Sequence, residues 1–277
     1  MAAQDTPVSR RLPVCKHIII GKSSVSAQLA LSLYASSPTA RVGILDVDLT
    51  GPSIPRMLGL DGHGVHQSTD GWVPVYADGS EARLACMSVG FLLKNKGDSV
   101  VWRGPKKNGM IRQFLSDCPV GRAGLPCHRY TSRYGTSDEH LSLLEHMAPV
   151  HSQLSSVIVT TPQAVALMDV MKCLSFTRAV NLPVWGLIEN MSGYVCPCCG
   201  EISNVFSTGG GEDMARREGL PFLGSLPVDT ELVTLLDASE PAQTDGAPGF
   251  RVLERYKSTP SAQIFESIVQ KIIQSCG

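Results

Sequence analysis

Short apolar runs alternate along the chain with amphipathic segments of helical length. The apolar runs have the length of strands and lie at residues 17–20, 41–47, 84–89, 156–159, 184–189 and 221–226. The segments with a helical pattern lie at residues 25–34, 108–116, 136–148, 164–179 and 211–218. Apolar strands separated by helices are typical of a parallel sheet covered on both faces. The pattern therefore predicts an α/β fold with a doubly wound, mostly parallel sheet.

The composition is that of a globular protein with a sizeable core. The chain has 277 residues, of which 43% are hydrophobic and 18% are charged. Its only loose stretch inside the expected fold is the segment 238–249, which is rich in Ala, Pro and Gly. We therefore expect residues 1–16 to be a disordered tail and residues 17–277 to form one domain.

Charge and hydropathy limit the kinds of partner and the cellular compartment that we expect for the protein. The formal net charge is −1, and the sequence has neither a block of Lys and Arg nor an apolar run of membrane-spanning length. We therefore expect neither nucleic acid nor a membrane as a partner. The first residues lack the apolar core of a signal peptide, and Asp5, Arg10 and Arg11 make a poor mitochondrial presequence. These features predict a cytoplasmic protein, with the nucleus as a second compartment.

A Gly-Lys-Ser-Ser sequence joins the first apolar run to the first helical segment. Gly21, Lys22, Ser23 and Ser24 match the end of a Walker A motif, in which helix amides and a Lys ammonium bind phosphate. The glycines that would wrap the phosphate are missing, because residues 18–20 are all isoleucine and run directly into Gly21. The alternative is an ordinary strand-to-helix turn in which Ser23 or Ser24 caps the helix.

Polar side chains follow three of the predicted strands. Asp46 and Asp48 lie at the end of the second apolar run, Glu189 and Asn190 at the end of the fifth, and Asp229 follows the sixth. Ligands of doubly wound folds gather at the carboxyl ends of the strands. Two acids spaced two residues apart lie on one side of a strand end, where a carboxylate can hold the water of a bound Mg²⁺ or orient an attacking water. The alternative is that both acids are solvated and cap the next turn.

Cys196 and Cys199 form a C-x-x-C sequence, with Cys198 as an additional thiol between them. This spacing lets two thiolates of a tight turn bind one metal centre. The chain has nine cysteines and no second C-x-x-C, so one copy offers half of a four-thiolate site. A symmetric dimer would complete the site with two sulfurs from each copy. From the spacing alone, zinc, a redox dithiol, a shared iron–sulfur cluster and a plain surface turn all stay open.

Several motifs occur together in unbroken order over nearly the whole chain. They read VGILDVDLTGPSIPRMLG, MSVGFLL, VVWRGPKKN, GTSDEH, VTTPQAVALMDV, GLIENMSGYVCPCC, FSTGGGE and PFLGSLPVD. With these motifs the chain resembles the Mrp-type family of P-loop ATPases. The resemblance implies the ParA/MinD-like form of the P-loop NTPase fold, and it favours an iron–sulfur cluster over zinc at Cys196 and Cys199.

The resemblance also implies cargo, cofactors and partners. A labile 4Fe–4S cluster would be assembled at a dimer interface and passed to apo iron–sulfur proteins. The chain would pair with itself as a homodimer and with a sister Mrp-type subunit in a heterotetramer. ATP and Mg²⁺ would bind at the P-loop.

The nucleotide site implied by the resemblance has catalytic and binding residues. Lys22 would contact the β- and γ-phosphates, and Asp48 would position the attacking water. Ser23 would bind Mg²⁺. The other residues implied for cofactor binding, of which the last two would face the base, are Gly21, Ser24, Asp46, Asn190 and Asp229.

Two stretches depart from the family pattern. The family has a glycine-rich loop and a signature Lys where the first strand here runs directly into Gly21. Before GTSDEH the family has a strand and a Walker B-like turn close to WGELDYLVIDTPP, where this chain has CPVGRAGLPCHRYTSRY. If each codon of residues 118–134 is read one base later, the degeneracy of the genetic code permits that motif residue after residue, and register returns at Gly135. This predicts that residues 118–134 are a frameshifted translation and that the P-loop gap is a comparable lost segment.

These observations are compatible with three alternative functions. The first is a nucleotide-gated iron–sulfur scaffold, whose ATP hydrolysis depends on the two altered stretches. The second is a metal-binding or regulatory subunit that has lost nucleotide binding. The third is a membrane-positioning ATPase of the MinD type, which would use the last helix. The polar face of that helix carries Glu266 and Lys271 and is not basic. We therefore expect the helix to pack on its own domain through its apolar face. That face is formed by Ile264, Phe265, Ile268, Val269, Ile272 and Ile273.

Overall fold

The computed structural model describes residues 18–20, 23–48, 51–68, 71–92, 104–117, 138–196, 198–199, 201–204, 206–237 and 251–275. The strands of a first sheet are β1 (Ile18–Ile20), β7 (Leu154–Thr160), β8 (Val184–Val195), β9 (Ile202–Ser203) and β10 (Phe222–Val228). They run in the order β1-β7-β8-β10, all parallel, and β9 pairs antiparallel with β8. This sheet therefore carries the polar strand ends of β8 and β10 and the cysteine segment between β8 and β9.

A second sheet carries the Asp46 and Asp48 segment. Its strands are β2 (Val42–Asp46), β5 (Val75–Tyr76) and β6 (Leu84–Ser88), in the order β2-β6-β5. Strands β2 and β6 are parallel, and β5 is antiparallel to β6. Next to it, β3 (His66–Ser68) and β4 (Gly71–Val73) form an antiparallel hairpin.

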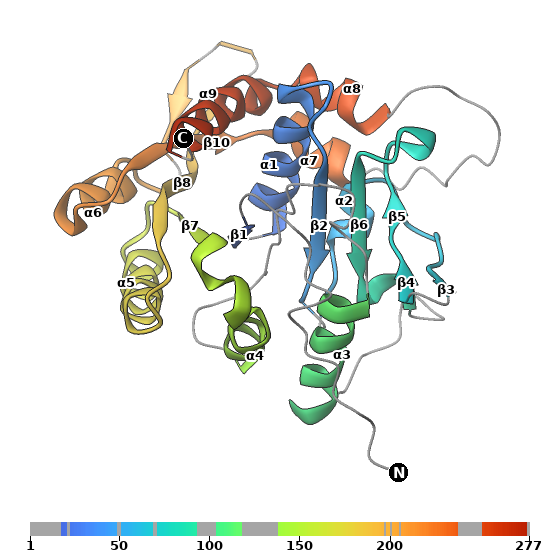
Figure 1. Ribbon diagram of the computed structural model, residues 1–277. Helices are drawn as coiled ribbons and strands as arrows, with labels where there is room; N and C mark the ends of the chain where they lie inside the picture. The colour runs from blue at the N-terminus through green and yellow to red at the C-terminus, as the bar shows by residue number, and fades with distance from the viewer. Residues whose placement is uncertain are drawn as a thin grey trace.

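Helices cover both faces of the two sheets (Figure 1). The α-helices are α1 (Ser23–Ser36), α2 (Ile54–Met57), α3 (Gly104–Asp117), α4 (Asp138–Met147), α5 (Ala164–Ala179), α6 (Gly210–Glu218), α7 (Thr230–Asp237), α8 (Arg251–Lys257) and α9 (Pro260–Ser275). Short 3₁₀ turns lie at Gly79–Glu81, Val89–Leu92 and Ala148–Gln153. Along β2 the side chains alternate between the two layers, because Ile44 belongs to the core on one face and Leu45 to the core on the other.

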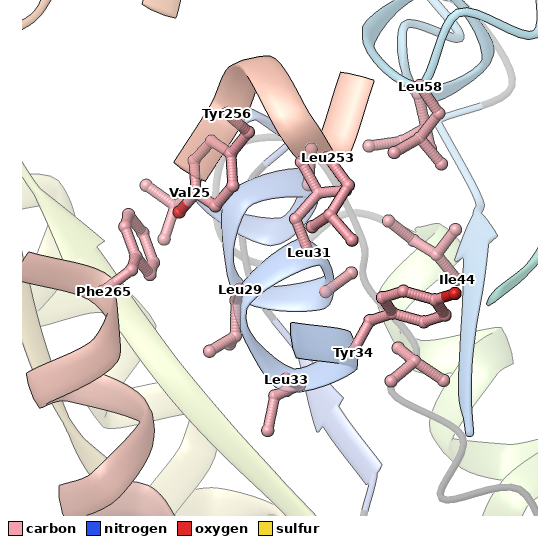
Figure 2. Packing of buried hydrophobic residues seen from close by; sticks show 14 of the residues in the cluster. Val25, Leu29, Leu31, Leu33, Tyr34, Ile44, Leu58, Leu253, Tyr256 and Phe265 are labelled. Carbon is pink, nitrogen blue, oxygen red and sulfur yellow. The ribbon is translucent and has the colours of Figure 1, made fainter. Parts of the chain in front are cut away.

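Each hydrophobic layer holds the two sheets together. On one face, α1, α7, α8 and α9 share a core with β2, β6, β7, β8 and β10. Figure 2 shows how Leu31 of α1, Ile44 of β2, Tyr256 of α8 and Phe265 of α9 contribute to this core. On the other face, α3 and α4 pack on β2, β6 and β7, while α5 and α6 pack on β7 and β8. The result is a three-layer α/β/α arrangement, as the apolar pattern predicts.

The expected strands and helices are confirmed, but the described strands form more than one sheet. All six predicted strands and all five predicted helices occur, and β8 continues beyond its expected end at residue 189 as far as Val195. Among the described residues, β1 is an edge of the first sheet, β2 is an edge of the second, and no strand pairs with both (Figure 1). The segment 118–134, for which the sequence predicts a lost central strand, lies outside the described residues, as do the tail 1–16 and the stretch 238–249.

The last helix, α9, packs on the domain, as predicted. Phe265, Ile268, Val269 and Ile272 are all almost completely buried in the core with α1. Most of this apolar face is therefore used for packing within the domain, although Ile273 is 43% exposed. Within the described part of the chain, no helix combines the length and the hydropathy needed to cross a membrane.

Candidate functional site

Asp46 is a buried carboxylate at the end of β2. Its Oδ1 accepts a hydrogen bond from the backbone N–H of Asp48 at 3.1 Å. Its Oδ2 accepts hydrogen bonds from the backbone N–H groups of Ser53 and Ile54 and from Ser88 Oγ, at 3.1, 3.3 and 3.3 Å. Burial raises the pKa of Asp46 to about 7, although the hydrogen bonds from Ile54 and Asp48 act in the opposite direction. Both oxygens of Asp46 therefore hold the loop that follows β2.

Asp48 has a different position in the same loop. Its side chain is 8% exposed, and its Oδ1 accepts a hydrogen bond from the backbone N–H of Gly51 at 3.1 Å. Because its own backbone N–H is fixed by Asp46, the direction of the Asp48 side chain depends on its neighbour. The sequence places the two acids together. In the structure, Asp46 stabilises the loop through its hydrogen bonds, and Asp48 is part of that loop. The role of Asp48 toward an attacking water stays a prediction.

The predicted phosphate-binding residues are only partly described. Ser23 and Ser24 form the first turn of α1 and are partly exposed. Gly21 and Lys22 lie outside the described residues. From residue 25 to residue 34 the helix is buried in the core, so its N-terminus is held firmly by packing. The phosphate and Mg²⁺ contacts of these residues stay predictions.

Glu189 and Asn190 lie where the pairing of β8 with β7 ends. The Oδ1 of Asn190 accepts a hydrogen bond from the backbone N–H of Met191 at 3.0 Å. Glu189 is completely buried, and its carboxylate accepts hydrogen bonds from Ser192 Oγ at 2.6 Å, from the N–H of Gly209 at 3.2 Å and from the N–H of Gly211. From the sequence, Glu189 was predicted only to lie at the end of a strand, and these hydrogen bonds were not predicted. The base contact predicted for Asn190 is not tested by this geometry.

Asp229 joins the N-termini of two helices. Its Oδ1 accepts a hydrogen bond from the N–H of Leu232 in α7 at 2.9 Å. Its Oδ2 accepts hydrogen bonds from the N–H and the Oγ of Ser261 in α9, at 3.1 and 2.6 Å. A carboxylate at helix N-termini is favourable because it satisfies unpaired N–H groups. The base contact predicted for Asp229 stays a prediction, and its observed partners give it a structural role.

The cysteine pair lies on a projecting hairpin formed by β8 and β9. The backbone N–H of Cys196 donates to the carbonyl oxygen of Glu201 at 2.9 Å, which closes the loop. Hydrogen bonds from the backbone amides of Cys199 and Cys198 lower the pKa of the Cys196 thiol. Cys198 and Cys199 are exposed, and Cys196 is partly exposed. The loop thus favours a thiolate at a surface where a second molecule can reach it.

One copy of the described hairpin offers an incomplete metal site. Among the residues that the structure describes, no group of three or more His, Cys, Asp or Glu side chains is arranged to hold a metal ion. The half-site expected from the sequence stays a prediction. The structure does not bring the cysteines together with Asp46 and Asp48, because the two groups lie on different sheets.

These features all lie within the part of the sequence that matches the model of one protein family. The model of ParA proteins, described as the NUBPL iron-transfer P-loop NTPase, matches residues 19–273. The chain belongs to this iron-transfer P-loop NTPase family. The match includes the strand ends of β2, β8 and β10 and the cysteine hairpin, so these features belong to one family unit.

Close relatives of this family member are known from fungi and animals. The chain is 58% identical over 247 residues to "Cytosolic Fe-S cluster assembly factor CFD1" of Mycosarcoma maydis, a match that covers 84% of this chain and 67% of the relative. It is 48% identical over 254 residues to "Cytosolic Fe-S cluster assembly factor NUBP2" of Bos taurus, with 92% and 88% covered. These levels of identity confirm the family resemblance seen in the motifs.

Solved structures confirm the ParA/MinD-like P-loop NTPase fold. A nucleotide-binding protein of Archaeoglobus fulgidus in complex with ADP has a TM-score of 0.69 and 28% identity, and the match covers 88% of this chain and 95% of that one. The septum site-determining protein MinD of Pyrococcus horikoshii with Mg-ADP has a TM-score of 0.60 and 16% identity, with 94% and 97% covered. The second likeness bears on the fold alone.

Proposed function

We propose that the protein is a cytosolic scaffold for iron–sulfur cluster assembly. Its cargo is a labile 4Fe–4S cluster that Cys196 and Cys199 of two copies hold at a dimer interface and release to apo iron–sulfur proteins. Relatives named as cytosolic Fe–S cluster assembly factors support this class of function and this compartment.

The observation that carries the proposal is the exposed cysteine pair on the β8–β9 hairpin. Cys199 is exposed and Cys196 partly exposed, and the amides that lower the pKa of Cys196 favour the thiolate needed for iron ligation. A resident structural zinc would require four ligands, and the described residues of one copy offer no such set. A cluster shared by two copies needs only the two cysteines that each copy offers. Because these cysteines lie at the surface, the cluster stays accessible for transfer.

A sister Mrp-type subunit is part of this proposal. Two copies of each chain would form a heterotetramer in which the cysteine pairs meet across a two-fold axis. ATP and Mg²⁺ would bind at the P-loop, with Lys22 and Asp48 in catalytic roles and Ser23 on Mg²⁺. The nucleotide-bound relative from Archaeoglobus fulgidus supports a nucleotide site in this fold.

A second candidate function is a metal-binding subunit that binds nucleotide weakly. It is favoured by the arrangement of the described strands, in which β1 and β2 belong to different sheets. Strand β1 precedes the predicted phosphate-binding turn, and Asp48 follows β2. Correct spacing of these two elements is a condition for phosphoryl transfer. In this case the chain would hold a cluster and contribute to a partner without hydrolysing ATP.

Anaerobic reconstitution with iron and sulfide distinguishes the candidates. A scaffold of either kind acquires a 4Fe–4S absorption and, after reduction, an electron paramagnetic resonance signal. Cluster formation together with ATP turnover supports the first candidate, and cluster formation without turnover supports the second. Retention of a single zinc ion, with no cluster under any condition, contradicts both.

A further inference from the structure

The cysteine hairpin leaves the body of the domain through a distortion in β8. Between Asn190 and Tyr194 strand β8 advances four residues, while its partner β10 advances two, from Leu226 to Val228. The intervening residues therefore form a bulge at Met191–Gly193. A bulge changes the direction of a strand, so this segment sets the direction in which β8 presents Cys196.

The bulge has an unfavourable backbone conformation. Met191 has a φ of 60° and Gly193 a φ of 82°. Glycine adopts such values freely, but a residue with a Cβ atom such as Met191 does so only when its surroundings hold it there. The observed restraints are the hydrogen bond from the Met191 N–H to Asn190 Oδ1 and the short hydrogen bond from Ser192 Oγ to Glu189.

Glu189 connects this bulge to the start of α6. One carboxylate oxygen accepts from Ser192 Oγ and from the N–H of Gly209, and the other accepts from the N–H of Gly211. A Cβ atom on Gly211 would lie 3.0 Å from both the Cβ and the Oε2 of Glu189. The glycine run of the FSTGGGE motif therefore lets the helix end lie against this carboxylate.

All three of these observed contacts are donated to Glu189, so the carboxylate acts as an acceptor only. A glutamine would place an N–H₂ group against at least one donor, and an aspartate would be too short to reach both the bulge and the helix. The residue is completely buried and cannot contact a cluster at the exposed loop directly. The observed contact that connects Glu189 to the strand segment leading to the cysteines is the hydrogen bond from Ser192.

We propose that Glu189 is a positioning residue for Cys196 and Cys199: through Ser192 it fixes the β8 bulge and thereby the orientation of the cysteine hairpin relative to α6. The inference rests on the proposed function only where the cluster is used as the readout. Outer partners that orient metal ligands change metal affinity by about tenfold to a hundredfold when they are removed.

The test compares Ser192→Ala, Ser192→Thr and Ser203→Ala in the full chain. Ser192→Ala removes the hydroxyl donor and Ser192→Thr retains it, while Ser203 is exposed on β9 of the same hairpin and serves as the matched control. After reconstitution, loss of iron to a chelator should be at least about tenfold faster in Ser192→Ala, with wild-type rates in the other two variants. Equal rates in all four proteins at equal thermal stability would overturn the inference.

A second readout does not require a cluster. The relative rates at which iodoacetamide alkylates Cys196 and Cys199 in the metal-free protein, measured by peptide mass spectrometry, should change in Ser192→Ala and in Glu189→Gln but not in Ser203→Ala. An unchanged ratio would contradict the positioning role. If the wild-type chain holds no cluster, the proposed function fails, and this alkylation ratio alone decides the inference.

Discussion

At the scale of single residues, the two acids after β2 have separate roles that their spacing does not reveal. The sequence predicts that both lie at one strand end, and this is where they lie. Only the structure shows that Asp46 accepts four hydrogen bonds while Asp48 occupies the loop that these bonds form. The distinction depends on burial and on Ser88 from a neighbouring strand, which no local pattern in the sequence encodes.

The raised pKa of Asp46 predicts a pH dependence of stability. Its pKa is raised from 3.8 to about 7 in the folded protein, so the folded state binds the proton more tightly than the unfolded state. The contribution of Asp46 to the free energy of unfolding therefore falls as pH rises from about 4 to about 7. Urea unfolding without nucleotide should show this fall in the wild type, and Asp46→Asn should lack that component. Asp213→Asn removes an exposed carboxylate of α6 as a control, and equal pH slopes in wild type and Asp46→Asn would contradict the assignment.

The cysteines give a second prediction at this scale. Cys196→Ala or Cys199→Ala should abolish retention of the reconstituted cluster, because each copy then supplies a single thiolate from the pair. Cys198→Ala should retain most of the cluster, since the pair at 196 and 199 satisfies the spacing. Iron and sulfide content after desalting measures the outcome, with circular dichroism as the control for folding. A full cluster in Cys196→Ala would refute the ligand assignment.

At the scale of elements, the helices α7 and α9 are joined by Asp229. The sequence predicts Asp229 as a strand-end residue, but its hydrogen bonds to Leu232 and Ser261 connect two helix N-termini that are 30 residues apart in the chain. The C-terminal helix was recognisable from its apolar face, whereas the short strands β3, β4, β5 and β9 were not predicted. Strands of two or three residues have too few positions for a periodic pattern.

Loss of Asp229 should destabilise both helices together. Removing one N-cap side chain costs about 0.5–2 kcal/mol, and Asp229 serves two N-termini. We expect Asp229→Ala to lower the free energy of unfolding by about 1–4 kcal/mol. Thr234→Ala, which removes a side-chain hydrogen bond within α7, is the matched control. Chemical denaturation followed by circular dichroism measures both, and equal stabilities of the two variants would count against the double cap.

At the scale of the whole molecule, the described strands form separate sheets in place of the single sheet that the sequence predicts. The described strands end at β1 in one sheet and at β2 in the other, and shared helix layers hold the two parts together. Loss of one central strand would produce this arrangement. The family motifs were sufficient to predict the fold, whereas the lost strand at residues 118–134 stays a prediction, because that segment lies outside the described residues. The bulge at Met191–Gly193 was not predictable, because its conformation depends on a buried carboxylate and on α6.

The missing glycine-rich loop before Gly21 predicts weak nucleotide binding by this chain. A helix N-terminus alone contributes about 0.3–1 kcal/mol and at most about 2 kcal/mol, whereas micromolar affinity requires about 8 kcal/mol. Titration calorimetry should detect little MgATP binding. Binding should recover when a GKGGV-type segment precedes Gly21 and the strand of the shifted frame replaces residues 118–134. Tight binding by the unrepaired chain would show that the defect is misread, and a transcript that encodes residues 118–134 in the stated frame would exclude the frameshift.

In the proposed function, two copies of the cysteine hairpin share one 4Fe–4S cluster. Native mass spectrometry of the anaerobically reconstituted protein tests it most directly, because it reports the number of chains and the bound iron and sulfide in the same ion. We expect a species with two chains and one 4Fe–4S cluster, which separates into cluster-free monomers in Cys199→Ala. A monomer that carries the whole cluster, or a dimer that carries only zinc, would contradict it.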